Sequence, residues 1–160
     1  MNNGYRVVAI PTSVAREVRE TMRSPGYGHP ATSEVAAGDG PCRHCLRTFE
    51  PGRDRRILFT YDAFSGTETL PLPGPIFVHE RECARYDENR GFPQALKARP
   101  LTFSAYAHGR RLVEKAYPAN GELDAALERL LARADVDYVH VRDTEAGCYD
   151  FRIERAGAES

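Results

Sequence analysis

The residues of this 160-residue chain best suited to metal or redox chemistry are its four cysteines and five histidines. Cys42 and Cys45 form a Cys-x-x-Cys pair within the heptapeptide PCRHCLR. Such a turn delivers two thiolates to one zinc ion without straining the backbone. His79 and Cys83, in FVHEREC, have a spacing of four, which would place both side chains on one side of a helical turn. The four residues together predict a Cys3His zinc site.

The number of protein ligands decides whether this metal would be structural or catalytic. If all four residues bind, the site is closed and therefore structural. If Cys83 points away, an open position would allow a zinc-bound water with a pKa near ~7, and Glu80 or Glu82 would be the nearest base. The side chain of His44, between the two cysteines, is expected to point away from the metal.

Two catalytic interpretations of PCRHC were compared with the rest of the chain. The zinc deaminase signature needs an H-x-E upstream, but the one upstream histidine, His29, is followed by Pro-Ala, which excludes that chemistry. A thiol oxidoreductase motif would need a βαβ frame, which the chain does not offer. An enzyme using Cys42 as nucleophile or redox thiol, with His79 or His140 as base, remains the alternative to a zinc-stabilised binding or accessory protein. Buried thiols without metal also stay open.

The elements that must position these residues are mostly strands. Alternating or β-rich runs predict strands at 5–10, 56–64, 76–79 and 101–107, a hairpin into 110–117, and a closing pair at 136–143 and 148–156. The run 101–107 alternates apolar with polar residues, as a half-buried strand does. Helical spacing predicts helices at about 12–22 and 122–134. The sequence therefore predicts a single α+β domain over 1–160, with a mostly antiparallel sheet of about six or seven strands and two helices.

One segment, residues 23–41, reads as a long flexible loop within that domain. It holds four glycines and three prolines in nineteen residues. Loops of this length in compact domains are either disordered or functional.

The overall charge and hydropathy exclude several classes of partner. With 22 basic and 23 acidic residues, the formal charge of -1 gives no general attraction to nucleic acid or anionic lipid. No stretch approaches the ~18 apolar residues of a membrane span, and the first residues do not resemble a secretory signal. We therefore expect a cytoplasmic protein, with no nucleic-acid or membrane partner. In that reducing compartment, close cysteine pairs favour metal binding over disulfides.

Several motifs resemble the bacterial family catalogued as domain of unknown function 1203. They are PCR at 41–43, GPIFVH at 74–79 and YVHV at 138–141, followed by Gly147-Cys148 and Arg155. The resemblance spans nearly the whole chain and implies no activity, because the family has no assigned reaction. It also implies that zinc binding belongs to a subgroup, since some members have PCR without the second cysteine. The alternative that it suggests is a pocket for a small anionic ligand, held bidentately by Arg43 and lined by Cys42, Arg43, His79, His140 and Cys148.

Overall fold

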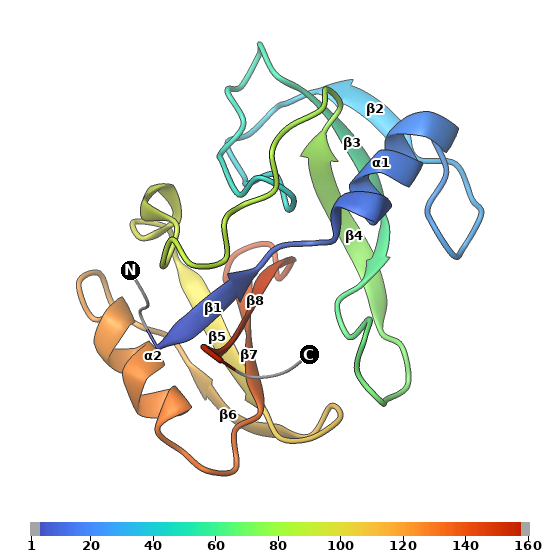
Figure 1. The fold of residues 1–160 in the computed structure, drawn as a ribbon. Coiled ribbons are helices and arrows are strands. Elements are labelled where there is room, and N and C mark those ends of the chain that lie inside the picture. Colours follow the sequence, from blue (N-terminus) through green and yellow to red (C-terminus); the bar gives the residue numbers. More distant parts are fainter. Residues whose placement is uncertain (1–3, 158–160) are drawn as a thin grey trace.

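The computed structural model describes residues 4–157, and within that range eight strands form two antiparallel sheets (Figure 1). The larger sheet has the strand order β1-β8-β7-β5-β6, and the smaller sheet has the order β2-β3-β4. The strands of the larger sheet are β1 (Tyr5–Val8), β5 (Leu101–Tyr106), β6 (Leu112–Ala116), β7 (Tyr138–Asp143) and β8 (Tyr149–Arg155). Those of the smaller sheet are β2 (Thr32–Val35), β3 (Arg55–Asp62) and β4 (Pro73–His79).

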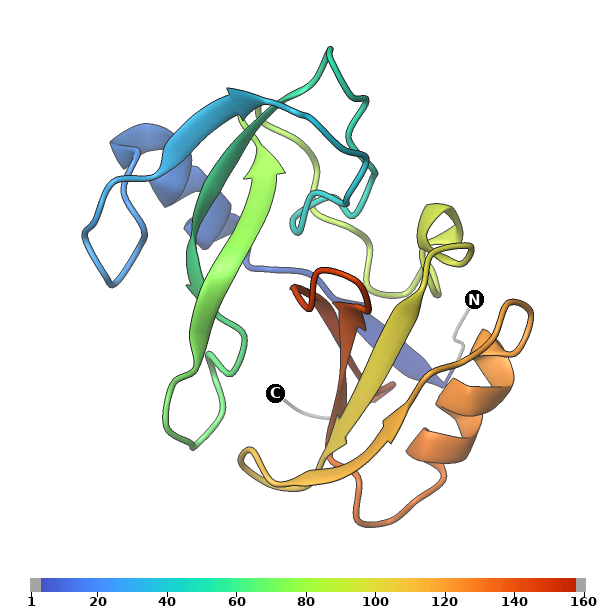
Figure 2. The ribbon, with the colours of Figure 1, turned by 180° about the vertical axis from the view of Figure 1, so that it is seen from behind.

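Helix α2 (Leu123–Leu131) covers the face of the larger sheet that is turned away from the smaller sheet (Figures 1 and 2). Its Leu123, Leu127 and Leu130 follow the spacing of one helix face and are buried. They join a core with Phe103 of β5 and Phe151 of β8. The helix predicted at 122–134 is therefore present, and its apolar stripe is what binds it to the sheet.

Helix α1 (Thr12–Thr21) packs against the smaller sheet. Three residues, 9–11, separate the end of β1 from the start of α1, and they carry the chain from the larger lobe, built on the larger sheet, to the smaller lobe, built on the smaller sheet. Ala15 and Val18 of α1 share a second core with Ile57 of β3 and Val78 of β4. No helix in the described part of the chain is long and apolar enough to cross a bilayer.

The face of the larger sheet opposite α2 carries polar residues that are nevertheless buried. Ser104 of β5 lies opposite His140 of β7, and their exposed fractions are 1% and 0%. Asp150 of β8 is also 0% exposed. The smaller sheet reaches this face, where the rings of Tyr61 in β3 and Tyr149 in β8 lie 6.2 Å apart. Strand β5 is therefore buried on both faces, and the prediction of a half-buried strand at 101–107 is wrong.

The predicted class, α+β with mostly antiparallel sheet, is confirmed, although the strands divide into two sheets. The described residues hold eight strands rather than six or seven because β2 lies inside the segment predicted as loop at 23–41. Thr32 and Val35 at the ends of β2 have β-branched side chains, which favour strands. Their pairing with Leu58 and Arg55 of β3 satisfies backbone groups that a free loop would leave to water.

Candidate metal centre

Cys42 and Cys45 lie on a tight knuckle formed by residues 41–48, whose two ends are joined by an isolated β-bridge. Inside it, the Cys42 N–H donates to the Arg47 carbonyl at 2.9 Å and the Leu46 N–H donates to the Cys42 carbonyl at 2.8 Å. Leu46 has a φ of 61°, in the left-handed region that residues with a side chain rarely occupy. This turn brings the two thiols to one point.

His79 and Cys83 reach the same point from the end of β4. His79 is the last residue of that strand, and residues 80–83 bend without forming a helix. The predicted helical turn is therefore wrong. Arg19 of α1 holds the bend instead, because its Nε donates to the His79 carbonyl at 3.1 Å and its Nη2 to the Cys83 Sγ at 3.2 Å.

The structure brings the four predicted ligands together. The ligand atoms of Cys42, Cys45, His79 and Cys83 all lie within 4.8 Å of one another. The Cys42 and Cys83 sulfurs are 3.9 Å apart, and the Cys45 Sγ is 3.3 Å from the His79 Nδ1. Tetrahedral zinc gives edges of about 3.8 Å between two sulfurs and about 3.6 Å between sulfur and nitrogen. The cluster therefore has the composition and the dimensions of a metal site.

The sulfur atoms receive hydrogen bonds from groups that are not ligands. The His79 backbone N–H donates to the Cys42 Sγ at 3.2 Å. The His44 Nδ1 lies 3.2 Å from the Cys83 Sγ, and its Nε2 lies 3.0 Å from the Thr12 hydroxyl oxygen. A thiolate can only accept, so the Nδ1–H would donate to Cys83 while the Nε2 accepts the Thr12 proton. The expectation that His44 points away from the cluster is therefore wrong.

Charge is distributed unevenly over the cluster. Burial raises the pKa of Cys42, whose side chain is fully enclosed. Contacts with the Cys42 and Cys45 sulfurs lower the pKa of Cys83. Hydrogen bonding to Cys45, and then to Cys83, raises the pKa of His79 to about 9. Metal ligands must be deprotonated, so a metal ion would displace protons from this cluster.

A carboxylate lies behind the histidine of the cluster. The His79 Nδ1 faces Cys45, while its Nε2 lies 3.7 Å from the Asp54 Oδ2. This distance exceeds that of a hydrogen bond, so the attraction is electrostatic. Carboxylates placed behind a ligating imidazole fix its orientation and raise its basicity. Arg19, His44 and Asp54 are thus supporting residues that the ligand spacing did not reveal.

Comparison with protein families adds one finding. The family model described as "Protein of unknown function (DUF1203)" matches residues 40–155. The chain belongs to the DUF1203 family. The resemblance seen in PCR, GPIFVH and YVHV is thereby confirmed, and all four cluster residues lie inside the matched region. No match was found among curated proteins or among solved structures.

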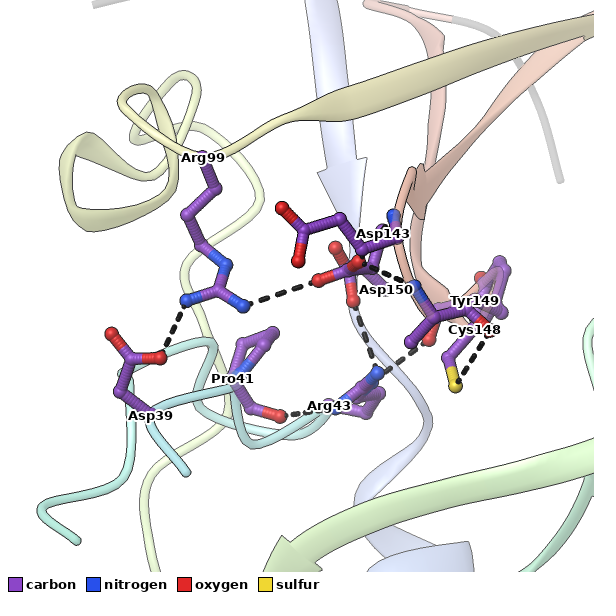
Figure 3. A network of polar contacts seen from close by, with 10 residues as sticks. Asp39, Pro41, Arg43, Arg99, Asp143, Cys148, Tyr149 and Asp150 are labelled. Atoms are coloured by element: carbon purple, nitrogen blue, oxygen red, sulfur yellow. Dashed lines mark hydrogen bonds and ion pairs between the residues drawn. The ribbon is translucent and has the colours of Figure 1, made fainter. Parts of the chain in front are cut away.

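Arg43, within the PCR motif of this DUF1203 chain, is enclosed and fully engaged (Figure 3). Its Nε donates to the Tyr149 carbonyl at 2.8 Å and its Nη1 to the Pro41 carbonyl at 2.6 Å. Its Nη2 lies 3.1 Å from the Asp150 carboxylate. Burial raises the pKa of Asp150 to about 6, and the charge of Arg43 opposes that shift. Arg43 therefore ties the knuckle to strand β8, and each of its three guanidinium nitrogens has a partner inside the protein.

The other two residues of the predicted pocket lie away from the cluster. His140 is enclosed by four aromatic rings at centroid distances of 4.8–5.2 Å, those of Phe64, Tyr106, Tyr138 and Tyr149. Neither of its ring nitrogens has a hydrogen-bond partner among the described residues, and burial lowers its pKa. Cys148 lies beside a separate cavity of about 190 Å³. The DUF1203 fold thus joins Cys42 and His79 but does not bring Arg43, His140 and Cys148 to them.

Proposed function

We propose that Cys42, Cys45, His79 and Cys83 bind one Zn²⁺ ion in a closed structural site of a non-catalytic binding protein. The observation that supports this is the convergence of four ligand atoms within 4.8 Å, two from the knuckle and two from the end of β4. Three thiols and an imidazole are the donors that zinc prefers over magnesium or calcium. Four protein ligands fill its tetrahedron and leave no position for a water.

The bound ion would reinforce a junction that already has backbone hydrogen bonds, from the Arg43 N–H to the Phe77 carbonyl and from the Tyr86 N–H to the His44 carbonyl, each at 3.0 Å. The knuckle precedes β3 and the Cys83 bend follows β4, so the ion would fasten the open end of the β3-β4 hairpin. The N–H donors at Cys42 and Cys83 would offset the negative charge of three thiolates on one divalent ion. These free thiols suit a reducing compartment, and we propose a bacterial cytoplasmic location on that basis.

The enzyme alternative is less well supported by the geometry. A nucleophilic or redox cysteine must be reached by its substrate and must ionise readily. Cys42 has no exposed surface, and burial raises its pKa. Both features favour a thiol that acts as a ligand.

Metal analysis of tag-free protein, combined with thiol titration before and after chelation, tests the proposal. We expect one zinc per chain. Cys148 lies away from the cluster and should react at once, whereas Cys42, Cys45 and Cys83 should react only after chelation. In the Cys148→Ser variant the early reaction should disappear and the zinc should stay. Absence of bound metal, or one hyper-reactive thiol at Cys42, would overturn the proposal.

A further inference from the structure

An open groove of about 870 Å³ lies directly beside the metal centre. Cys45, His79 and Cys83 form part of its wall, and residues 86–95, which lead into β5, form the opposite side. Its volume is in the range of sites for small organic ligands. The groove is therefore large enough to hold a molecule of that class next to the cluster.

Three arginines from three different segments line this groove. They are Arg47 on the knuckle, Arg81 in the bend after β4, and Arg90 before the short helix at Gln94–Leu96. None has a carboxylate within 4.0 Å among the described residues, although most arginines of the smaller lobe are ion-paired or bonded to carbonyls. Interaction with the nearby Cys45 sulfur raises the pKa of Arg47. The guanidinium carbon of Arg90 lies 5.9 Å from the centre of the Tyr86 ring. Arg81 makes no polar contact with any residue of 4–157.

The carboxylates of the groove do not neutralise these arginines. Glu50 lies 3.3 Å from Arg53, outside the groove, and Asp54 faces His79 while it accepts the Glu50 N–H. Glu82 is the groove carboxylate that has no ion pair in the described part of the chain. No groove carboxylate lies within ion-pair distance of a groove arginine in the described part of the chain, so all three guanidinium groups can still pair with an anionic ligand.

We infer that this groove binds a phosphate monoester, with Arg47, Arg81 and Arg90 around the phosphate. A carboxylate offers one planar edge, which a single guanidinium fills, whereas a phosphate presents three oxygens to donors from different directions. Three arginines that line one groove from three different segments therefore suit a phosphate better than a carboxylate. Because the groove is far larger than a phosphate ion, the ligand should also have an organic body, and Tyr86 offers it an aromatic wall.

This inference rests on the proposed function, because the metal would hold one wall of the groove in place. Arg47 lies next to Cys45, and Arg81 lies between His79 and Cys83, so both depend on the geometry of the cluster. The metal ion would then hold the groove wall in its folded conformation, and the ligand would not need to contact the ion.

Titration of zinc-loaded protein with phenyl phosphate, inorganic phosphate and benzoate, followed by calorimetry and amide NMR shifts, tests the inference. We expect phenyl phosphate to bind most tightly, with shifts confined to residues of the groove. Arg81→Gln and Arg90→Gln should each weaken its binding by at least about tenfold, the typical effect of losing a charged hydrogen bond. Arg111→Gln, which removes the same charge from the β5-β6 turn outside the groove, should leave binding unchanged.

Zinc content is measured on every sample, so that failure of the phosphate site can be distinguished from failure of the structural zinc site. One zinc per chain with no binding at millimolar phenyl phosphate would overturn the phosphate site and leave the structural zinc site intact. Binding weakened equally by Arg111→Gln would also overturn it, because the attraction would then be nonspecific. If benzoate binds as tightly as phenyl phosphate, the groove does not distinguish a phosphate from a carboxylate, and the assignment of a phosphate monoester is overturned. A metal-free protein would instead overturn the proposed function.

Discussion

The buried contact between Arg43 and Asp150 gives the sharpest stability test of this fold. Removing one partner of a buried ion pair costs about 3–5 kcal/mol, because the other charge stays unpaired. Asp150→Asn leaves Arg43 its two carbonyl acceptors, at Pro41 and Tyr149, so we expect a loss of about 3 kcal/mol. Arg43→Met leaves a carboxylate and two carbonyls without these donors. With about 1 kcal/mol for each carbonyl added to the cost of the unpaired charge, we expect a loss of about 5–7 kcal/mol of stability.

The double variant distinguishes this reasoning from simple loss of packing. Arg43→Met combined with Asp150→Asn no longer contains the unpaired charge, so it should be more stable than Arg43→Met alone. Urea unfolding of the zinc-loaded proteins at pH 7.5 measures all four free energies. If the two single losses simply add in the double variant, the ion pair carries no coupling and the reasoning is refuted. Should Arg43→Met not fold, recovery of a cooperative transition in the double variant tests the same point.

Three further predictions concern residues around the same two lobes. Burial lowers the pKa of His140, so the unfolded chain binds its proton first and stability falls as the pH drops below about 6.5. When the pH falls from 7.5 to 5.5, the free energy of unfolding, measured with urea, should decrease by about 1.4 kcal/mol more in the natural protein than in the His140→Leu variant. Equal decreases in the two proteins would contradict this. His44→Leu removes the donor to the Cys83 sulfur and should weaken zinc binding about 10–100-fold in competition with a chelator, whereas His44→Asn, with an amide near the Nδ1 position, should recover part of it. Leu46→Gly relieves about 1 kcal/mol of left-handed strain but removes a buried side chain worth about 2–5 kcal/mol, so a net loss is expected, and a gain in melting temperature would show that strain dominates.

The spacing of residues along the sequence was sufficient to predict the elements whose structure depends on neighbouring residues. The leucine spacing of α2 and the alternation in β7 and β8 are set within one element, and both were predicted from the sequence. The convergence of Cys42, Cys45, His79 and Cys83 was also predicted, and the Cys-x-x-Cys spacing accounts for the first pair. For His79 and Cys83 the residues were predicted correctly, but the helical turn expected to align them is replaced by a bend.

Features that depend on distant segments could not be predicted in this way. Arg19 reaches Cys83 across 64 positions of sequence, and Asp54 reaches His79 across the β3-β4 hairpin. Nothing in the local spacing marks either one. The burial of His140 and Asp150 was not predicted for the same reason, since Phe64, which follows β3, and Arg43 of the knuckle reach these residues from distant parts of the sequence.

The pairing of β1 with β8 has a consequence for how a fragment of this protein would behave. The family match begins at residue 40, but Val7 of β1 lies opposite Ile153 of β8 at one margin of the larger sheet. A fragment cut at 40–155 would leave the β8 margin with free N–H and C=O groups next to an apolar surface. Such a margin recruits strands from other molecules and promotes aggregation. Recombinant versions of this chain should therefore retain the first 39 residues, even though they lie outside the region that defines the family.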